Sequence, residues 1–135
     1  MSRISLAEAG EIRRELPGFK DACIREIQYG DPMMPPHMNV DECFEMAPSR
    51  RYRGLWRGGF EVSIFCSAPA RQCDRYRDKK IWLSGEIGKR DPAHELYAVD
   101  FIGRRTRYPG GFGHMNAATY ELVVDRLLSR TPVPD

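Results

Sequence analysis

Hydrophobic and polar residues alternate most strictly between residues 60 and 67, in the stretch FEVSIFCS. Phe60, Val62, Ile64 and Cys66 fall on one face of that stretch, and polar residues occupy most of the positions between them. A period of two over this length is typical of a β-strand with one buried face. The preceding stretch begins at Arg51 and has the same character. We therefore predict a β-hairpin here.

Three further segments combine apolar, aromatic and β-branched residues between glycine, proline or charged residues, and we predict strands over 51–56, 80–84 and 96–103. The sequence RGG at 57–59 predicts the glycine turn of the hairpin. In the last of these strands, Tyr97, Val99 and Phe101 share one face.

The segment 119–129, TYELVVDRLLS, fits two structures. Its apolar residues recur at spacings of three and four, which is typical of an amphipathic helix. The adjacent pair Val123 and Val124 favours a strand instead. We favour a fifth strand, because four strands alone would leave an unprotected sheet edge.

The N-terminal part predicts a different structure. Ser5 and Glu8 form a capping box, apolar residues follow at helical spacing, and Pro17-Gly18 ends the pattern, so a helix is expected over 6–16. Residues 19–29 fit a second helix or a strand. The proline- and methionine-rich segment 30–48 cannot form a regular helix or an inner strand.

Together these elements predict an α+β, mainly β, fold in one domain over residues 1–135. Its parts are an N-terminal helix within 1–18, the irregular segment 30–48 and a β-rich body over 50–129. Four or five short strands favour a small, strongly bent antiparallel sheet or a partial barrel, for which the OB-type barrel is one example. We expect such curvature to bring the hairpin at Phe60 close to the glycine-rich segment near Tyr108.

Composition agrees with a folded, water-soluble chain, with 41% hydrophobic and 30% charged residues. No apolar run approaches the roughly 20 residues that cross a bilayer. The first residues contain no continuous apolar stretch of the kind found in secretory signals, which predicts a cytoplasmic protein.

Charge is unevenly distributed. Residues 1–47 contain five basic and nine acidic residues, whereas residues 48–135 contain sixteen basic and ten acidic residues, and the sum is +2. The basic excess lies in RRYR (50–53), RYRDKK (75–80) and RRTR (104–107). This asymmetry indicates either an anionic partner or a solvated face whose long side chains cover apolar surface.

Four cysteines occur, at 23, 43, 66 and 73, without a C-x-x-C pair, so a zinc ribbon or thioredoxin-type site is not supported. Cys66 and Cys73 flank a short loop, and a disulfide between them would staple a hairpin. Cys23 and Cys43 would then form a second pair. Paired cysteines would place the protein in an oxidising, extracytoplasmic compartment. Buried free thiols are the alternative.

The strongest chemical motif is RRTRYPGGFGHMN, residues 104–116. Its glycines, among them Gly110 and Gly111, allow backbone N–H groups to surround an anion. Arg104, Arg105 and Arg107 would add charge. The motif matches neither a Walker loop nor a dinucleotide fingerprint. The alternative is an ordinary turn at Tyr108 between two strands.

His114 is a weak candidate for general acid–base catalysis, with only distant partners such as Asp100 or His94. The sequence has no G-x-S-x-G elbow, and His37, His94 and His114 lack the spacing of a helix-borne metal site. We expect neither a metal nor a cofactor.

Aromatic residues interleave with the basic ones, an arrangement that binds single-stranded nucleic acid in barrel modules. Exposure of Tyr52, Trp56 and Phe112 on one face would favour such binding, and burial would weaken it.

The sequence thus predicts a non-catalytic binding domain for an anionic polymer (nucleic acid or polysaccharide) or an acidic protein partner. The expected binding residues are Arg51, Arg53, Trp56, Arg104, Arg105, Arg107, Tyr108, Gly110, Gly111 and His114. The alternatives are a disulfide-stapled structural or envelope-associated domain, and a small enzyme that uses His114.

Overall fold

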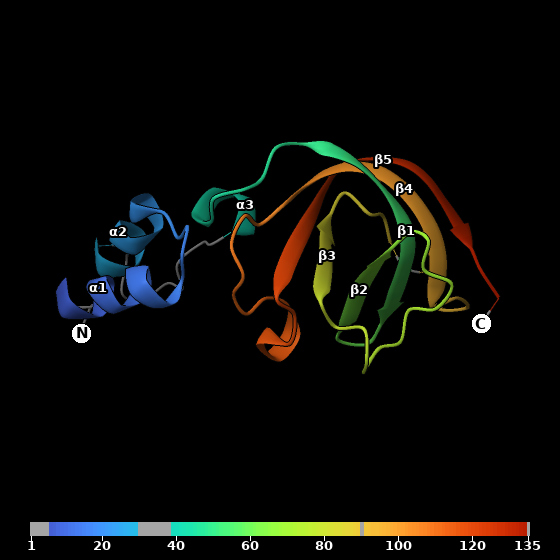
Figure 1. Cartoon of the computed structure of the whole chain (residues 1–135), viewed down its shortest axis with the longest axis horizontal. Helices are drawn as coiled ribbons and strands as arrows, with labels where there is room; N and C mark the ends of the chain where they lie inside the picture. The colour runs from blue at the N-terminus through green and yellow to red at the C-terminus, as the bar shows by residue number, and fades with distance from the viewer. Residues whose placement is uncertain (1–5, 30–38, 90, 135) are drawn as a thin grey trace.

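A computed structural model describes residues 6–29, 39–89 and 91–134. Five strands form a closed barrel in the order β1-β2-β3-β5-β4, and β4 pairs back with β1 (Figure 1). The strands are β1 (Arg50–Gly59), β2 (Val62–Ser67), β3 (Ile81–Gly85), β4 (Leu96–Arg105) and β5 (Tyr120–Pro132). The described part of the chain is therefore mostly β, as predicted.

The barrel differs from the predicted sheet in closure and in strand direction. β3 and β5 are parallel, from the pair Ile81–Tyr120 to the pair Gly85–Val124, whereas every other neighbouring pair is antiparallel. The sheet is closed rather than partial. The reason lies in pairing between distant segments, which strand patterns along the chain do not record.

The barrel interior is filled by large apolar side chains from all five strands. Tyr97, Val99 and Phe101 point inward from β4, as their alternation predicts. On β2 the inward residue is Phe65, whereas Ile64 packs on the outer face. Both faces of this hairpin are therefore buried. The alternation of hydrophobic and polar residues predicted the strand, but it did not show which face of the strand lines the barrel.

The turn of the hairpin lies further along the chain than predicted. β1 continues through Gly59, and the turn is formed by Phe60 and Glu61. Glu61 has a positive φ of 56°. Phe60 is consequently not a buried strand residue but is 81% exposed.

The outer face of the β1–β2 hairpin is covered by the loop between β2 and β3. Leu55, Ile64 and Leu96 pack there against Cys73, which forms a disulfide with Cys66. The loop can cover this apolar surface because the disulfide fixes its first turn against the strand.

In the described part of the chain, three short helices precede the barrel, where one was predicted: α1 (Leu6–Glu15), α2 (Asp21–Tyr29) and α3 (Val40–Cys43). The segment 19–29 is thus helical, and the segment 30–48 contains a helical turn, while its residues 30–38 lie outside the described part. A small core of Phe19, Cys23, Ile24 and Cys43 joins the helices, with a disulfide between Cys23 and Cys43. Among the described residues, no helix has the length and apolar character that a bilayer crossing requires.

The last element is a strand, as we favoured over a helix. β5 lies between β3 and β4, and its inward residues Leu122 and Val124 belong to the barrel core. Leu128, which the helical pattern would bury, is exposed. Because β5 forms backbone hydrogen bonds with both β3 and β4, this segment is a strand despite the helical spacing of its apolar residues.

Candidate functional site

A cleft of ≈ 330 Å³ opens on the outer surface over β2 and β3. Three connections surround it: the β1–β2 turn, the β2–β3 loop and the segment between β4 and β5. Its lining residues are Phe60, Glu61, Val62, Ile64, Arg75, Tyr76, Lys79, Trp82, His114, Met115, Ala117 and Ala118. The predicted proximity of the Phe60 hairpin and the glycine-rich segment is therefore correct.

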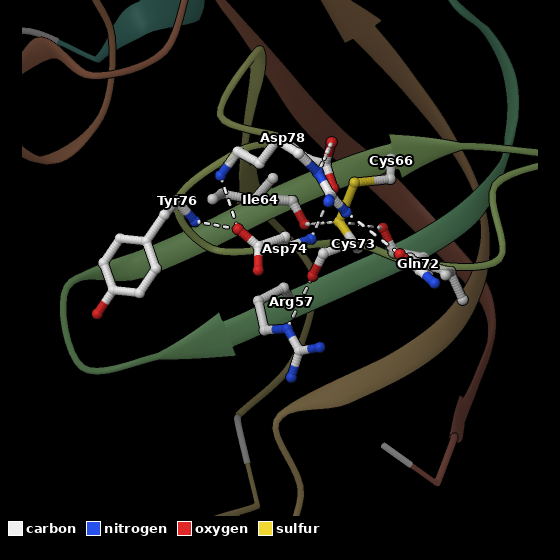
Figure 2. The surroundings of a disulfide bond; sticks show 10 residues. Arg57, Ile64, Cys66, Gln72, Cys73, Asp74, Tyr76 and Asp78 are labelled. Carbon is white, nitrogen blue, oxygen red and sulfur yellow. Dashed lines mark hydrogen bonds and ion pairs between the residues drawn. A yellow bond between two sulfur atoms is a disulfide. The ribbon is translucent and has the colours of Figure 1, made fainter.

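The β2–β3 loop is held by hydrogen bonds from its own backbone. The carboxylate of Asp74 accepts the backbone N–H groups of Tyr76 and Arg77, at 2.9 and 2.7 Å, and these bonds lower the pKa of Asp74. Asp78 accepts the N–H of Asp74 at 2.7 Å. Figure 2 shows the ring of Tyr76 projecting away from this turn and from the nearby disulfide.

The segment between β4 and β5 closes on itself next to the cleft. Phe112 and Ala118 exchange both backbone hydrogen bonds, at 2.8 and 3.0 Å, around a 3₁₀ turn, η1 (His114–Asn116). The buried ring of Phe112 packs edge-on against Phe44, with centroids 5.0 Å apart. The segment between β4 and β5 is thereby anchored through Phe112 to Phe44, which follows α3, and its η1 turn lines the cleft.

His114 connects two walls of the cleft. Its Nε2 lies 2.9 Å from the Oε2 of Glu61 in the β1–β2 turn. Within the described residues, the non-glycine residues with positive φ are Glu61, which makes this contact, and Met115 and Asn116, which follow His114 in η1. Such backbone conformations cost free energy and concentrate at functional sites, which makes the cleft rim the strongest candidate.

The cleft also gathers exposed hydrophobic side chains. Phe60, Tyr76 and Met115 are 81%, 73% and 83% exposed, the highest values among the large hydrophobic residues described. The guanidinium of Arg75 lies 5.9 Å from the centre of the Tyr76 ring. Apolar patches of this kind on a folded protein mark surfaces that contact a ligand or partner.

Most of the predicted arginines lie elsewhere, in ion pairs. Arg51 and Arg53 both contact Asp100, at 2.6 and 3.2 Å, and the hydrogen bond from Arg51 lowers the pKa of this carboxyl. Arg104 lies 2.7 Å from a carboxylate oxygen of Asp125.

The other two arginines of the RRTR motif also have partners. Arg107 lies 3.1 Å from Glu45, and the guanidinium of Arg105 lies 4.1 Å from the ring centre of Tyr120. Since carboxylates neutralise much of the charge in these clusters, the binding role expected for them stays a prediction.

The predicted aromatic and glycine positions are divided between core and surface. Trp56 is only 4% exposed and stacks on Tyr97 inside the barrel, which removes it as a surface contact. Phe112 is also buried, and Tyr52 is half-buried. Tyr108, Gly110 and Gly111 line none of the cleft, so His114 is the member of the predicted site that does.

Sequence reasoning missed the residues at the cleft that come from the β2–β3 loop and β3. The basic cluster RYRDKK includes Arg75, Tyr76 and Lys79. Its charge is evident from the sequence, but its position beside the cleft is not. Trp82 on β3 is half-buried and lines the cleft. The available signal was Tyr76, an aromatic residue within a basic cluster, and only the fold shows that it lines the same cleft as His114.

A second cavity, between α3, β3 and β5, contains several carboxylates. Glu121 lies there, partly buried, and accepts a hydrogen bond from the Ser84 hydroxyl at 2.8 Å. Burial raises the pKa of Glu121, and the charge of Asp41 raises it further. Deprotonation of the Glu121 carboxyl is therefore less favourable in the folded protein than in the unfolded chain.

We expect Glu121→Gln to increase the free energy of unfolding at pH 7 and to leave it unchanged near pH 3. A carboxyl with a raised folded-state pKa binds its proton more tightly when folded, so wild-type stability falls as pH rises from about 4.3 through that raised value. Urea unfolding of both proteins from pH 3 to 8 measures this difference. If the difference in unfolding free energy between the two proteins does not change with pH, the raised pKa of Glu121 is wrong.

Among the described residues, no group of three or more histidine, cysteine, aspartate or glutamate side chains is arranged to hold a metal ion. A catalytic role of His114 also stays a prediction, since its contact with Glu61 provides a carboxylate partner but identifies no substrate. Comparison with known proteins adds no identity: no protein-family model, curated protein or solved structure matches this chain significantly.

Proposed function

We propose that this chain is a non-catalytic binding domain whose cleft holds a ring-bearing segment of an anionic polymer. The observation that carries this proposal is the convergence of Phe60, Tyr76 and Met115, the most exposed large hydrophobic residues described, on a cleft that Arg75 and Lys79 also line. Flat side chains stack on ring faces, and the neighbouring cations attract the charged groups of the polymer.

The barrel architecture supports the same proposal. We propose that the barrel is of the OB type. It is closed from five strands in the order β1-β2-β3-β5-β4, in which β5 lies between β3 and β4. OB-type barrels bind oligonucleotides and oligosaccharides over strands 2 and 3, between the β1–β2 and β4–β5 loops. The cleft is lined from β2, β3 and both of these connections.

The disulfides favour a polysaccharide as the polymer. Two disulfides in a chain of this size, Cys23–Cys43 and Cys66–Cys73, are typical of proteins that act in an oxidising compartment. Nucleic acids are handled chiefly in reducing compartments, whereas acidic and sulfated polysaccharides occur outside them. We therefore propose that the protein acts outside the cytoplasm, which is the alternative expected from the sequence if the four cysteines are paired.

We expect the double variant Phe60→Ala/Tyr76→Ala to bind a sulfated polysaccharide about tenfold or more weakly than wild type. Each lost stacking surface removes about 1–3 kcal/mol of binding free energy. Because both side chains are exposed, their removal should leave unfolding unchanged. Fluorescence anisotropy at fixed salt measures the dissociation constants for a heparin fragment, oligothymidylate and poly-glutamate.

Leu128→Ala is the matched control, since Leu128 is an exposed hydrophobic residue on β5 that does not line the cleft. Its affinity should equal that of wild type. Equal binding of the double variant and wild type to all three polymers would contradict the proposal, as would no binding to any of them. Preference for oligothymidylate or poly-glutamate would reassign the polymer to nucleic acid or to an acidic protein.

A further inference from the structure

Another cavity, of ≈ 340 Å³, lies beside the β2–β3 loop, and three arginines line it. Arg57 comes from β1, and Arg71 and Arg77 come from the loop. Gln72 and Asp74 are the other polar side chains of its lining. This cavity shares no lining residue with the cleft described above, although one loop contributes to both.

Arg57 is held in position at the base of this cavity. Its Nε–H donates to the backbone carbonyl of Cys73 at 2.9 Å, and its side chain is only 12% exposed. Figure 2 shows its terminal nitrogens on the side away from that carbonyl. A guanidinium fixed in this way loses little side-chain entropy when it binds an anion.

The loop that carries the other two arginines is rigidly attached. The Cys66–Cys73 disulfide joins its beginning to β2, and Cys73 is fully buried (Figure 2). Arg77 donates to the side-chain oxygen of Gln72 at 3.2 Å, which directs the guanidinium toward the residues next to the disulfide. Arg57 is thus fixed by the fold, whereas Arg71, Gln72 and Arg77 are exposed residues of a loop whose beginning the disulfide fixes.

The charge of the cavity is positive. Three guanidinium groups oppose the carboxylate of Asp74, which is engaged by the backbone N–H groups of Tyr76 and Arg77. These hydrogen bonds, with the charges of Arg77 and Arg57, lower the pKa of Asp74. Two further carboxylates form ion pairs with these arginines, Glu95 at 3.9 Å from Arg57 and Asp78 at 3.8 Å from Arg77.

We propose that this arginine-lined cavity binds a tetrahedral oxyanion, the sulfate or phosphate group of a ligand. Guanidinium groups form paired hydrogen bonds with such oxyanions, and three of them around one cavity match the several oxygens of the group. The site goes beyond the proposed function, because it takes a small anion by itself and requires no residue of the cleft.

The test is a titration of the full chain, with its disulfides intact, with sodium sulfate and with sodium phosphate at constant ionic strength set by chloride. The Arg57 Nε–H resonance, observed by ¹⁵N-edited NMR, should shift saturably with either oxyanion. In Arg71→Ala/Arg77→Ala the affinity should fall about tenfold or more, since two charge-assisted contacts are lost. Arg57→Lys keeps the charge without the paired donors and should also weaken binding, as measured from the backbone N–H resonances of the β2–β3 loop.

Arg126→Ala is the control, since Arg126 is exposed on β5 outside this cavity, and it should bind sulfate as wild type does. The cleft variant Phe60→Ala/Tyr76→Ala should also retain sulfate binding, which separates this site from the proposed function. Displacement of sulfate by a sulfated disaccharide or by thymidine monophosphate would support the site and identify the source of the group. A shift that chloride reproduces, or that persists in the arginine double variant, would overturn it.

Discussion

Phe101→Ala should lower the free energy of unfolding by about 3–5 kcal/mol, a large fraction of the roughly 5–15 kcal/mol that stabilises a domain. Phe101 has no exposed surface at the centre of the barrel, where it stacks on Tyr52 and meets Phe65 edge-on. Its removal leaves a cavity that strands paired on both sides cannot close. Guanidinium unfolding with the disulfides intact measures the change.

Phe60→Ala provides a matched control, because the same side chain is removed from an exposed turn. Its unfolding free energy should lie within about 0.5 kcal/mol of wild type. Phe101→Leu, which keeps most of the buried volume, should fall between the two. If the Phe101 and Phe60 alanine variants unfold at the same denaturant concentration, the assignment of Phe101 to the barrel core is wrong.

Gly113→Ala should reduce polymer binding at the cleft about a hundredfold and destabilise the fold by about 2–6 kcal/mol. Gly113 has φ 75° and ψ −168°, a conformation that only glycine adopts readily. An added Cβ would also overlap the indole ring of Trp82. Relief of this overlap displaces Trp82 and η1 together, and strain and overpacking each cost about 1–3 kcal/mol.

The control for this variant is Gly10→Ala in α1, where a Cβ would meet only Arg14 at an ordinary distance of 3.6 Å. It should preserve binding and either preserve or raise stability, since alanine favours a helix. Binding isotherms and unfolding curves of both variants distinguish the outcomes. Wild-type affinity in Gly113→Ala would show that η1 does not shape the binding site.

The candidate site could be predicted only in part from the sequence. The glycine-rich segment drew attention to His114, and the curvature of a small sheet correctly placed it near the Phe60 hairpin. The neighbouring arginines attracted equal attention, because a sequence shows charge without its partners. Asp100 forms ion pairs with both Arg51 and Arg53 across the β1–β4 pair, a relation that appears only after the strands are placed side by side.

What the sequence determined by itself is local. Alternation set the strands around Val62 and Val99, because the pleat of a strand places successive side chains on opposite faces. Closure of the barrel, the parallel β3–β5 pair and the inward position of Phe65 were decided by the tertiary structure. Each of these depends on which distant segments pair, and the free energy of such pairing comes from burial shared among strands that are not neighbours along the chain.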